Sequence, residues 1–159
     1  MSTHTAVVAW GRNGATFTDN RYSRAHEWVF DGGIRVPASA SPHVVPPPMS
    51  RADAVDPEEA FVAALASCHM LFFLWIAARR GFVVERYRDD ASGVLDRDSD
   101  GHPAMTEITL SPQVAFAGNR RPSLDEHQAM HHDAHEACFL ARSLKTAVRC
   151  HPVDATGTT

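Results

Sequence analysis

Residues 56–81, DPEEAFVAALASCHMLFFLWIAARRG, decide the fold of this 159-residue chain. They carry the signals of one long helix. Asp56 suits the N-cap, Pro57 suits the first helical position, and Glu59 can close a capping box with Asp56. Two arginines followed by Gly81 predict the end of the helix near residue 80. We therefore expect one helix of about six turns at the centre of the fold.

The apolar part of this segment raises the question of a membrane. Residues 60–78 carry no formal charge over 19 positions, and about 20 apolar residues cross a bilayer. His69 in the middle and the many alanines, which insert weakly, favour a helix buried in protein and no membrane contact. A helix that is apolar on every side needs more cover than one small domain offers, so we expect a second copy of the chain to supply it.

Composition and charge fit one globular domain over residues 1–159. Hydrophobic residues make up 44% of the chain and charged residues 21%, as in ordinary soluble domains. The net charge of −4 argues against a nucleic-acid partner bound through its phosphates. Three cysteines are too few for a secreted disulfide framework, and no signal-peptide pattern opens the sequence. We therefore expect a cytoplasmic protein with reduced thiols.

Short strand signals and one further helix signal surround the long helix. The predicted strands lie at residues 4–10, 15–24, 26–30, 82–95, 105–116 and 146–153. A second helix over residues 123–145 begins with a capping box of Ser123 and Glu126. An irregular proline-rich loop is expected at residues 34–49 and a frayed tail at 154–159. The order β-β-β-α-β-β-α-β predicts an α+β fold with an antiparallel sheet.

Two cysteines occupy similar places on the two predicted helices. Cys68 lies about half-way along the apolar helix, and Cys138 lies on the second helix. A thiol pair from two packed helices would allow two-cysteine redox chemistry, in which the second thiol resolves a sulfenic acid formed on the first. Free cysteine is also among the most buried residue types, so a purely structural role for Cys68 is the alternative. The spacing leaves both interpretations open.

Thiol chemistry needs a neighbouring cation that lowers the pKa of the thiol. Arg12, Arg21 and Arg24 lie in the predicted N-terminal strands and turns, and Glu58 could hold one of them in a bidentate pair. Glu58 and Cys68 are ten residues apart, which is about 15 Å along a continuous helix. If both serve one site they come from different chains, in agreement with a dimer.

A second group of side chains could bind a metal. His131, His135 and Cys138 are spaced i, i+4 and i+7, so they lie near one face of a helix. Two histidines and one cysteine can bind zinc, but a surface stripe of histidines gives the same pattern and no fourth ligand is evident. Cys150 has no partner in the sequence, so a structural role is expected for it.

The long helix also resembles a known family. Asp56-Pro57-Glu58-Glu59-Ala60-Phe61, ALASCH over residues 64–69, and Ala137-Cys138 are similar to motifs of the osmotically inducible and organic hydroperoxide resistance (OsmC/Ohr-like) family of thiol peroxidases. The order of elements agrees from the first strand to about Val153. The resemblance implies an intertwined homodimer in which antiparallel sheets enclose two long central helices.

The same resemblance implies roles for individual residues. Cys68 would be the peroxidatic thiol, Cys138 the resolving thiol, and Glu58 the carboxylate that orients an activating arginine. Arg12, in a Gly-Arg-x-Gly turn, matches the hydroperoxide-resistance branch, whereas Arg24 lies nearer the strand that holds this arginine in the osmotically inducible branch. Both arginines are therefore candidates.

Other positions depart from the family pattern. The loop over residues 39–49 looks like that of a less-studied branch, and Phe139 stands where relatives commonly carry proline after the second cysteine. We expect His26, His69 and Phe72 to line the substrate pocket of this branch.

These observations predict a cofactor-free, cysteine-based peroxidase that reduces organic hydroperoxides to alcohols. The reaction would pass through a Cys68 sulfenic acid and a Cys68–Cys138 disulfide, and an external dithiol would restore both thiols. Two alternatives stay open. One is a non-catalytic module that binds small molecules on the same dimeric fold, and the other is a His/Cys metal-binding protein.

Overall fold

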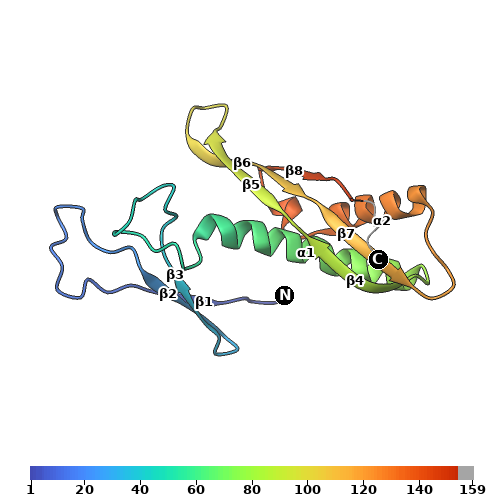
Figure 1. Ribbon diagram of the computed structural model, residues 1–159, viewed down its shortest axis with the longest axis horizontal. Coiled ribbons are helices and arrows are strands. Elements are labelled where there is room, and N and C mark those ends of the chain that lie inside the picture. The colour runs from blue at the N-terminus through green and yellow to red at the C-terminus, as the bar shows by residue number, and fades with distance from the viewer. Residues whose placement is uncertain (154–159) are drawn as a thin grey trace. The chain divides into compact units, whose positions relative to one another are not determined.

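Strands and two long helices alternate along residues 1–153, the part of the chain that this computed structural model describes (Figure 1). The elements are β1 (Ala6–Ala9), β2 (His26–Phe30), β3 (Arg35–Ala38), α1 (Pro57–Arg79), β4 (Val83–Asp89), β5 (Ser92–Arg97), β6 (Pro103–Leu110), β7 (Pro112–Ala117), α2 (Leu124–Ala137), η1 (Ala141–Ser143) and β8 (Ala147–Cys150). They belong to two compact units, Met1–Ala60 and Phe61–Thr159. The expected α+β class, with antiparallel sheets and two helices, is confirmed. The expected tail at residues 154–159 lies outside the described residues.

The first unit contains a three-stranded antiparallel sheet in the order β1-β2-β3. β2 occupies residues 26–30 as predicted, and Trp28 at its centre pairs with both neighbouring strands. β3 lies inside residues 34–49, so the prediction of a wholly irregular loop is wrong there. Pro37 is tolerated in β3 because this strand lies at an edge of the sheet.

The predicted strand over residues 15–24 does not form. Asn20 has a left-handed backbone with φ 60°, and its amide donates to the Phe17 carbonyl at 3.1 Å, which closes a turn. The aromatic side chains that suggested a strand pack on one another instead. The rings of Phe17 and Tyr22 stack with centroids 4.6 Å apart, and Trp10 meets Tyr22 edge-on. Turn chemistry and ring packing override strand propensity here.

The second unit builds its sheets from two antiparallel pairs, β4 with β7 and β5 with β6. In Figure 1, β5 follows β4 along one ribbon, and β6 and β7 run back beside them. The strands predicted at residues 82–95 and 105–116 are therefore each divided in two. A hydrogen bond connects the break between β4 and β5 with the break between β6 and β7. The Ser111 amide donates it to Asp89 Oδ1 at 2.7 Å. β8 adds to β6 as a parallel partner, which departs from the purely antiparallel expectation.

α1 begins and ends as predicted. The Glu59 amide donates to Asp56 Oδ1 at 2.7 Å, the Asp56 amide donates to Glu59 Oε2 at 3.2 Å, and Gly81 follows the last turn with φ 77°. By length and composition α1 could cross a membrane, and 28% of its most apolar window is buried in this chain. Leu71 and Trp75 remain 62% and 54% exposed. One copy of the chain therefore does not bury α1 on every side.

The second helix is shorter than the sequence indicates. The capping box of Ser123 and Glu126 is confirmed, but α2 ends at Ala137 rather than near residue 145. Cys138 leaves the helix in an extended conformation with ψ 114° and is fully buried. Burial of this side chain is a tertiary effect without a local signal, so the capping pattern did not reveal where the helix ends.

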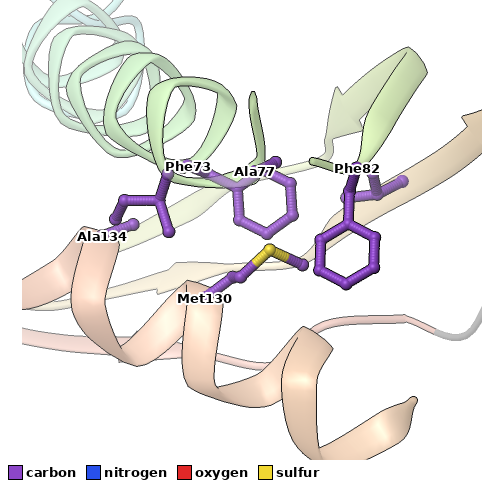
Figure 2. Packing of buried hydrophobic residues seen from close by; sticks show 7 residues of the cluster. Phe73, Ala77, Phe82, Met130 and Ala134 are labelled. Carbon is purple, nitrogen blue, oxygen red and sulfur yellow. The ribbon is translucent and has the colours of Figure 1, made fainter. Parts of the chain in front are cut away.

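The core of the second unit joins the two helices. Figure 2 shows Phe73 and Ala77 of α1 packed against Met130 and Ala134 of α2, with Phe82 beside them. All five side chains are buried, and the two alanines leave room for the larger Phe73 and Met130. A second buried cluster is formed by Leu65, Ile108, Leu110 and Cys138.

Candidate functional site

Two of the three cysteines lie close together in one apolar cluster. Cys68 of α1 is half-buried and packs against the apolar cluster that contains Cys138, which lies directly after α2 and is fully buried. Burial, and then the neighbouring Cys68 side chain, raise the pKa of Cys138 to about 11, so its thiol stays protonated at neutral pH. Proximity and unequal burial suit a pair in which one thiol reacts first and the other closes a disulfide.

Apolar side chains surround the thiol pair. Leu65, Ile108 and Leu110 are buried in the same cluster as Cys138, and the half-buried Phe72 packs against that cluster. The ring of Phe72 meets the exposed ring of Phe139 edge-on, with centroids 5.0 Å apart. Phe72, a predicted substrate-binding residue, therefore lies in surroundings that suit an apolar ligand.

The two candidate arginines lie in the first unit and are held differently. The Arg24 guanidinium donates to the Asn20 carbonyl at 3.0 Å and to its side-chain oxygen at 2.6 Å, and it lies 3.9 Å over the ring of Tyr22. Arg12 is exposed in a turn and donates to a backbone carbonyl at 2.6 Å. Glu58 Oε2 is buried without a hydrogen-bond partner. Within residues 1–153 of one chain, no ion pair joins Glu58 to either arginine.

An apolar pocket in the first unit brings Arg24 and His26 together. Its volume is about 470 Å³, and its other walls include Val8, Trp10, Phe17, Tyr22 and Pro57. The Trp28 indole N–H donates to His26 Nε2 at 3.0 Å, so Nδ1 carries the proton and donates it to the Arg24 carbonyl at 2.8 Å. The aromatic walls were missed because the sequence pattern had been interpreted as a strand.

A cluster of the buried His69 and His131 with the half-buried Cys150 joins α1, α2 and β8. His69 Nε2 lies 3.0 Å from His131 Nδ1, and Cys150 Sγ lies 3.7 Å and 3.8 Å from these two atoms. Burial lowers the pKa of His69 to about 4 and the pKa of His131 to about 3, and it raises the pKa of Cys150 to about 12. At neutral pH all three side chains are therefore uncharged.

This cluster differs from the metal-ligand set that the sequence offered as an alternative. Cys138 belongs to the thiol pair, and His135 lines a pocket of about 500 Å³ together with His131 and Cys150. Within residues 1–153, the possible metal ligands that gather are His69, His131 and Cys150, not His131, His135 and Cys138. The expectation of a merely structural Cys150 missed this cluster, because 81 positions separate it from His69 and no local spacing connects them.

Comparisons with known proteins place the chain among its relatives. The model of a family described as OsmC-like protein matches residues 50–152. An OsmC-like protein of unknown function from Vibrio cholerae is 54% identical, with 96% of this chain and 100% of that chain covered and a TM-score of 0.94. No curated protein matches the chain.

Two more distant structures share the fold. An organic hydroperoxide resistance protein OsmC from Legionella pneumophila is 16% identical over 98% of both chains, with a TM-score of 0.69. The organic hydroperoxide resistance protein OhrB of Bacillus subtilis is 17% identical over 96% of this chain and 98% of that chain, with a TM-score of 0.67.

Proposed function

The chain belongs to the OsmC-like protein family, and we propose that it is a thiol-dependent peroxidase that reduces organic hydroperoxides to alcohols. The observation that carries the proposal is the placement of Cys68 against the apolar cluster that contains Cys138. The names of the relatives from Legionella pneumophila and Bacillus subtilis, both organic hydroperoxide resistance proteins, agree with it.

The proposed reaction begins at Cys68, the more accessible of the two thiols. Its thiolate attacks the terminal peroxide oxygen, the O–O bond breaks, and the alkoxide takes up a proton and leaves as an alcohol. The sulfur of Cys68 is then a sulfenic acid. Cys138 attacks this sulfur, its proton leaves with the displaced hydroxide as water, and a disulfide forms. An external dithiol reduces the disulfide and returns both thiols.

The unequal environments of the two thiols support this order of events. The raised pKa of Cys138 keeps it protonated, so it does not compete for the peroxide. Cys68 packs against the cluster of Cys138 and acts on its thiol, so the two side chains start close together before a disulfide forms. The apolar surroundings, including Phe72, favour peroxides with an apolar organic group.

Activation of Cys68 is assigned to an arginine supplied by a second copy of the chain. Arg24 is the better candidate, because Asn20 and Tyr22 hold its guanidinium in one position beside an aromatic pocket, whereas Arg12 lies in an exposed turn. A nearby guanidinium would lower the pKa of the thiol and stabilise the departing alkoxide. The buried, unpartnered Oε2 of Glu58 is suited to accept a hydrogen bond from that arginine.

Two features of α1 support a homodimer in which both copies contribute to one site. α1 is continuous from Pro57 to Arg79, and ten residues of helix separate Glu58 from Cys68 by about 15 Å. The exposed Leu71 and Trp75 on the same helix supply apolar surface for a partner. Three free cysteines and the need for an external dithiol fit a reducing, cytoplasmic setting.

Peroxide turnover by the reduced protein with a dithiol donor tests the proposal. We expect Cys68→Ser to abolish the consumption of cumene hydroperoxide, because serine cannot form a sulfenic acid. Met70→Leu, a volume-conserving change two residues away, is the matched control and should keep turnover within about threefold. Full turnover in Cys68→Ser would overturn the assignment.

A further inference from the structure

We propose that His69, His131 and Cys150 form a zinc-binding site in the second unit, distinct from the peroxidase chemistry proposed for Cys68 and Cys138. The three ligand atoms, two imidazole nitrogens and one sulfur, lie within 4.8 Å of one another. They come from α1, α2 and β8, so one ion would link three elements of the core.

The distances between the ligand atoms match a tetrahedral zinc ion. Bonds of about 2.0 Å to nitrogen and about 2.3 Å to sulfur place two nitrogens about 3.3 Å apart, and a nitrogen and a sulfur about 3.5 Å apart. The observed separations are 3.0 Å between His69 Nε2 and His131 Nδ1, and 3.7 Å and 3.8 Å from these atoms to Cys150 Sγ. An ion could therefore enter with shifts of a few tenths of an ångström.

The hydrogen bonds around the cluster leave the ligand atoms available. The other ring nitrogen of His131 lies 3.2 Å from His127 Nε2, which orients the ring and leaves Nδ1 facing the cluster. His69 Nε2 contacts only His131 and Cys150 among the described residues, so coordination through this nitrogen replaces contacts within the cluster itself. The ring of Phe73 stacks on His131 with centroids 4.2 Å apart and fixes it further.

The charges near the cluster also favour a cation. Asp89 lies close enough to Cys150 to act on its thiol, and its Oδ2 atom is buried without a hydrogen-bond partner. Tyr87, whose hydroxyl is likewise buried and unpartnered, interacts with both groups. A zinc ion would bind Cys150 as a thiolate, release the thiol proton to water, and offset the negative charge of Asp89.

A pocket open to solvent reaches two of the three ligands, His131 and Cys150. This pocket of about 500 Å³ is lined by His131 and Cys150 together with His132, His135 and His151. It gives an ion access and leaves the fourth coordination position to a water molecule, as in zinc sites with three protein ligands. Two imidazoles and one thiolate select zinc over magnesium or calcium, which take oxygen ligands.

Metal analysis of the full-length protein tests the proposal. We expect the reduced, metal-stripped protein to bind about one zinc ion per chain, and cobalt in its place to give a thiolate-to-cobalt charge-transfer band. Cys150→Ser should remove this band and weaken zinc binding about 100-fold or more, the upper end of what even second-shell changes cost. Cys138→Ser, which removes a thiol outside the site, should leave band and stoichiometry unchanged.

Circular dichroism of each variant distinguishes a loss of metal binding from a loss of folding. A Cys150→Ser protein with the native spectrum that has lost the cobalt band supports the site. The proposal is overturned if the folded wild-type protein binds no zinc, or if its cobalt band persists in Cys150→Ser. It is also overturned if Cys138→Ser loses the band instead.

Discussion

Replacing Phe73 by alanine tests whether the packing between α1 and α2 holds the second unit together. Phe73 is completely buried at the centre of the core shown in Figure 2, and its ring contacts four others. The nearest ring is that of His131, with centroids 4.2 Å apart, followed by Tyr87 at 5.6 Å, His127 at 5.8 Å and Phe116 at 6.5 Å. The substitution would leave a cavity. The four rings belong to β4, β7 and α2, so they could move to fill it only partly.

The cost of Phe73→Ala follows from that packing. A buried phenylalanine replaced by alanine lowers the free energy of unfolding by about 3–5 kcal/mol, including the transfer of the ring and the cavity left behind. With a urea m-value of about 2 kcal/mol/M, the unfolding midpoint should fall by about 1.5–2.5 M. The measurement is urea unfolding of the reduced protein, followed by circular dichroism at one fixed protein concentration.

The matched control is Leu124→Ala, which shortens a 65% exposed side chain at the start of α2. Its free energy of unfolding should stay within about 0.5 kcal/mol of the wild-type value. If Phe73→Ala lowers the free energy of unfolding by less than about 1 kcal/mol, Phe73 does not pack tightly in the core. Such a small loss would indicate a solvated or mobile ring.

Three further outcomes follow from the thiol pair and from the exposed face of α1. Cys138→Ser should reduce one equivalent of organic hydroperoxide and then over-oxidise at Cys68, which mass spectrometry detects as added oxygen; sustained turnover would contradict the resolving role. Iodoacetamide labelling of the Cys138 peptide should rise about tenfold per pH unit below a pKa of about 11, and a plateau at neutral pH would contradict the raised value. Leu71→Asp places a charge on the exposed apolar face of α1, so sedimentation should show monomers where the wild-type protein is dimeric. A monomeric wild-type protein would contradict a site shared between two copies.

The starts of the helices were predictable from sequence because their signals are local. Asp56 with Glu59 and Ser123 with Glu126 close capping boxes within one turn, and both boxes form. The end of α2 was not predictable in the same way. It depends on the burial of Cys138 against residues far away in the sequence.

The candidate site was likewise predictable only where the signals are local. Cys68 and Cys138 could be singled out by residue type and by the motifs around them, but their proximity is a property of helix packing that spacing does not encode. Cys150 could not be connected to His69 and His131 before the parallel pairing of β8 with β6 was known. That pairing depends on long-range contacts, for which a short apolar strand carries no specific signal.

The most direct test of the central claim is intact-mass analysis with tryptic mapping after one equivalent of an organic hydroperoxide. A two-cysteine mechanism predicts the loss of two hydrogens relative to the reduced protein and a single new link between the Cys68 and Cys138 peptides. Unchanged mass with both thiols free would contradict it, and the fold would then serve as a binding module without peroxidase chemistry.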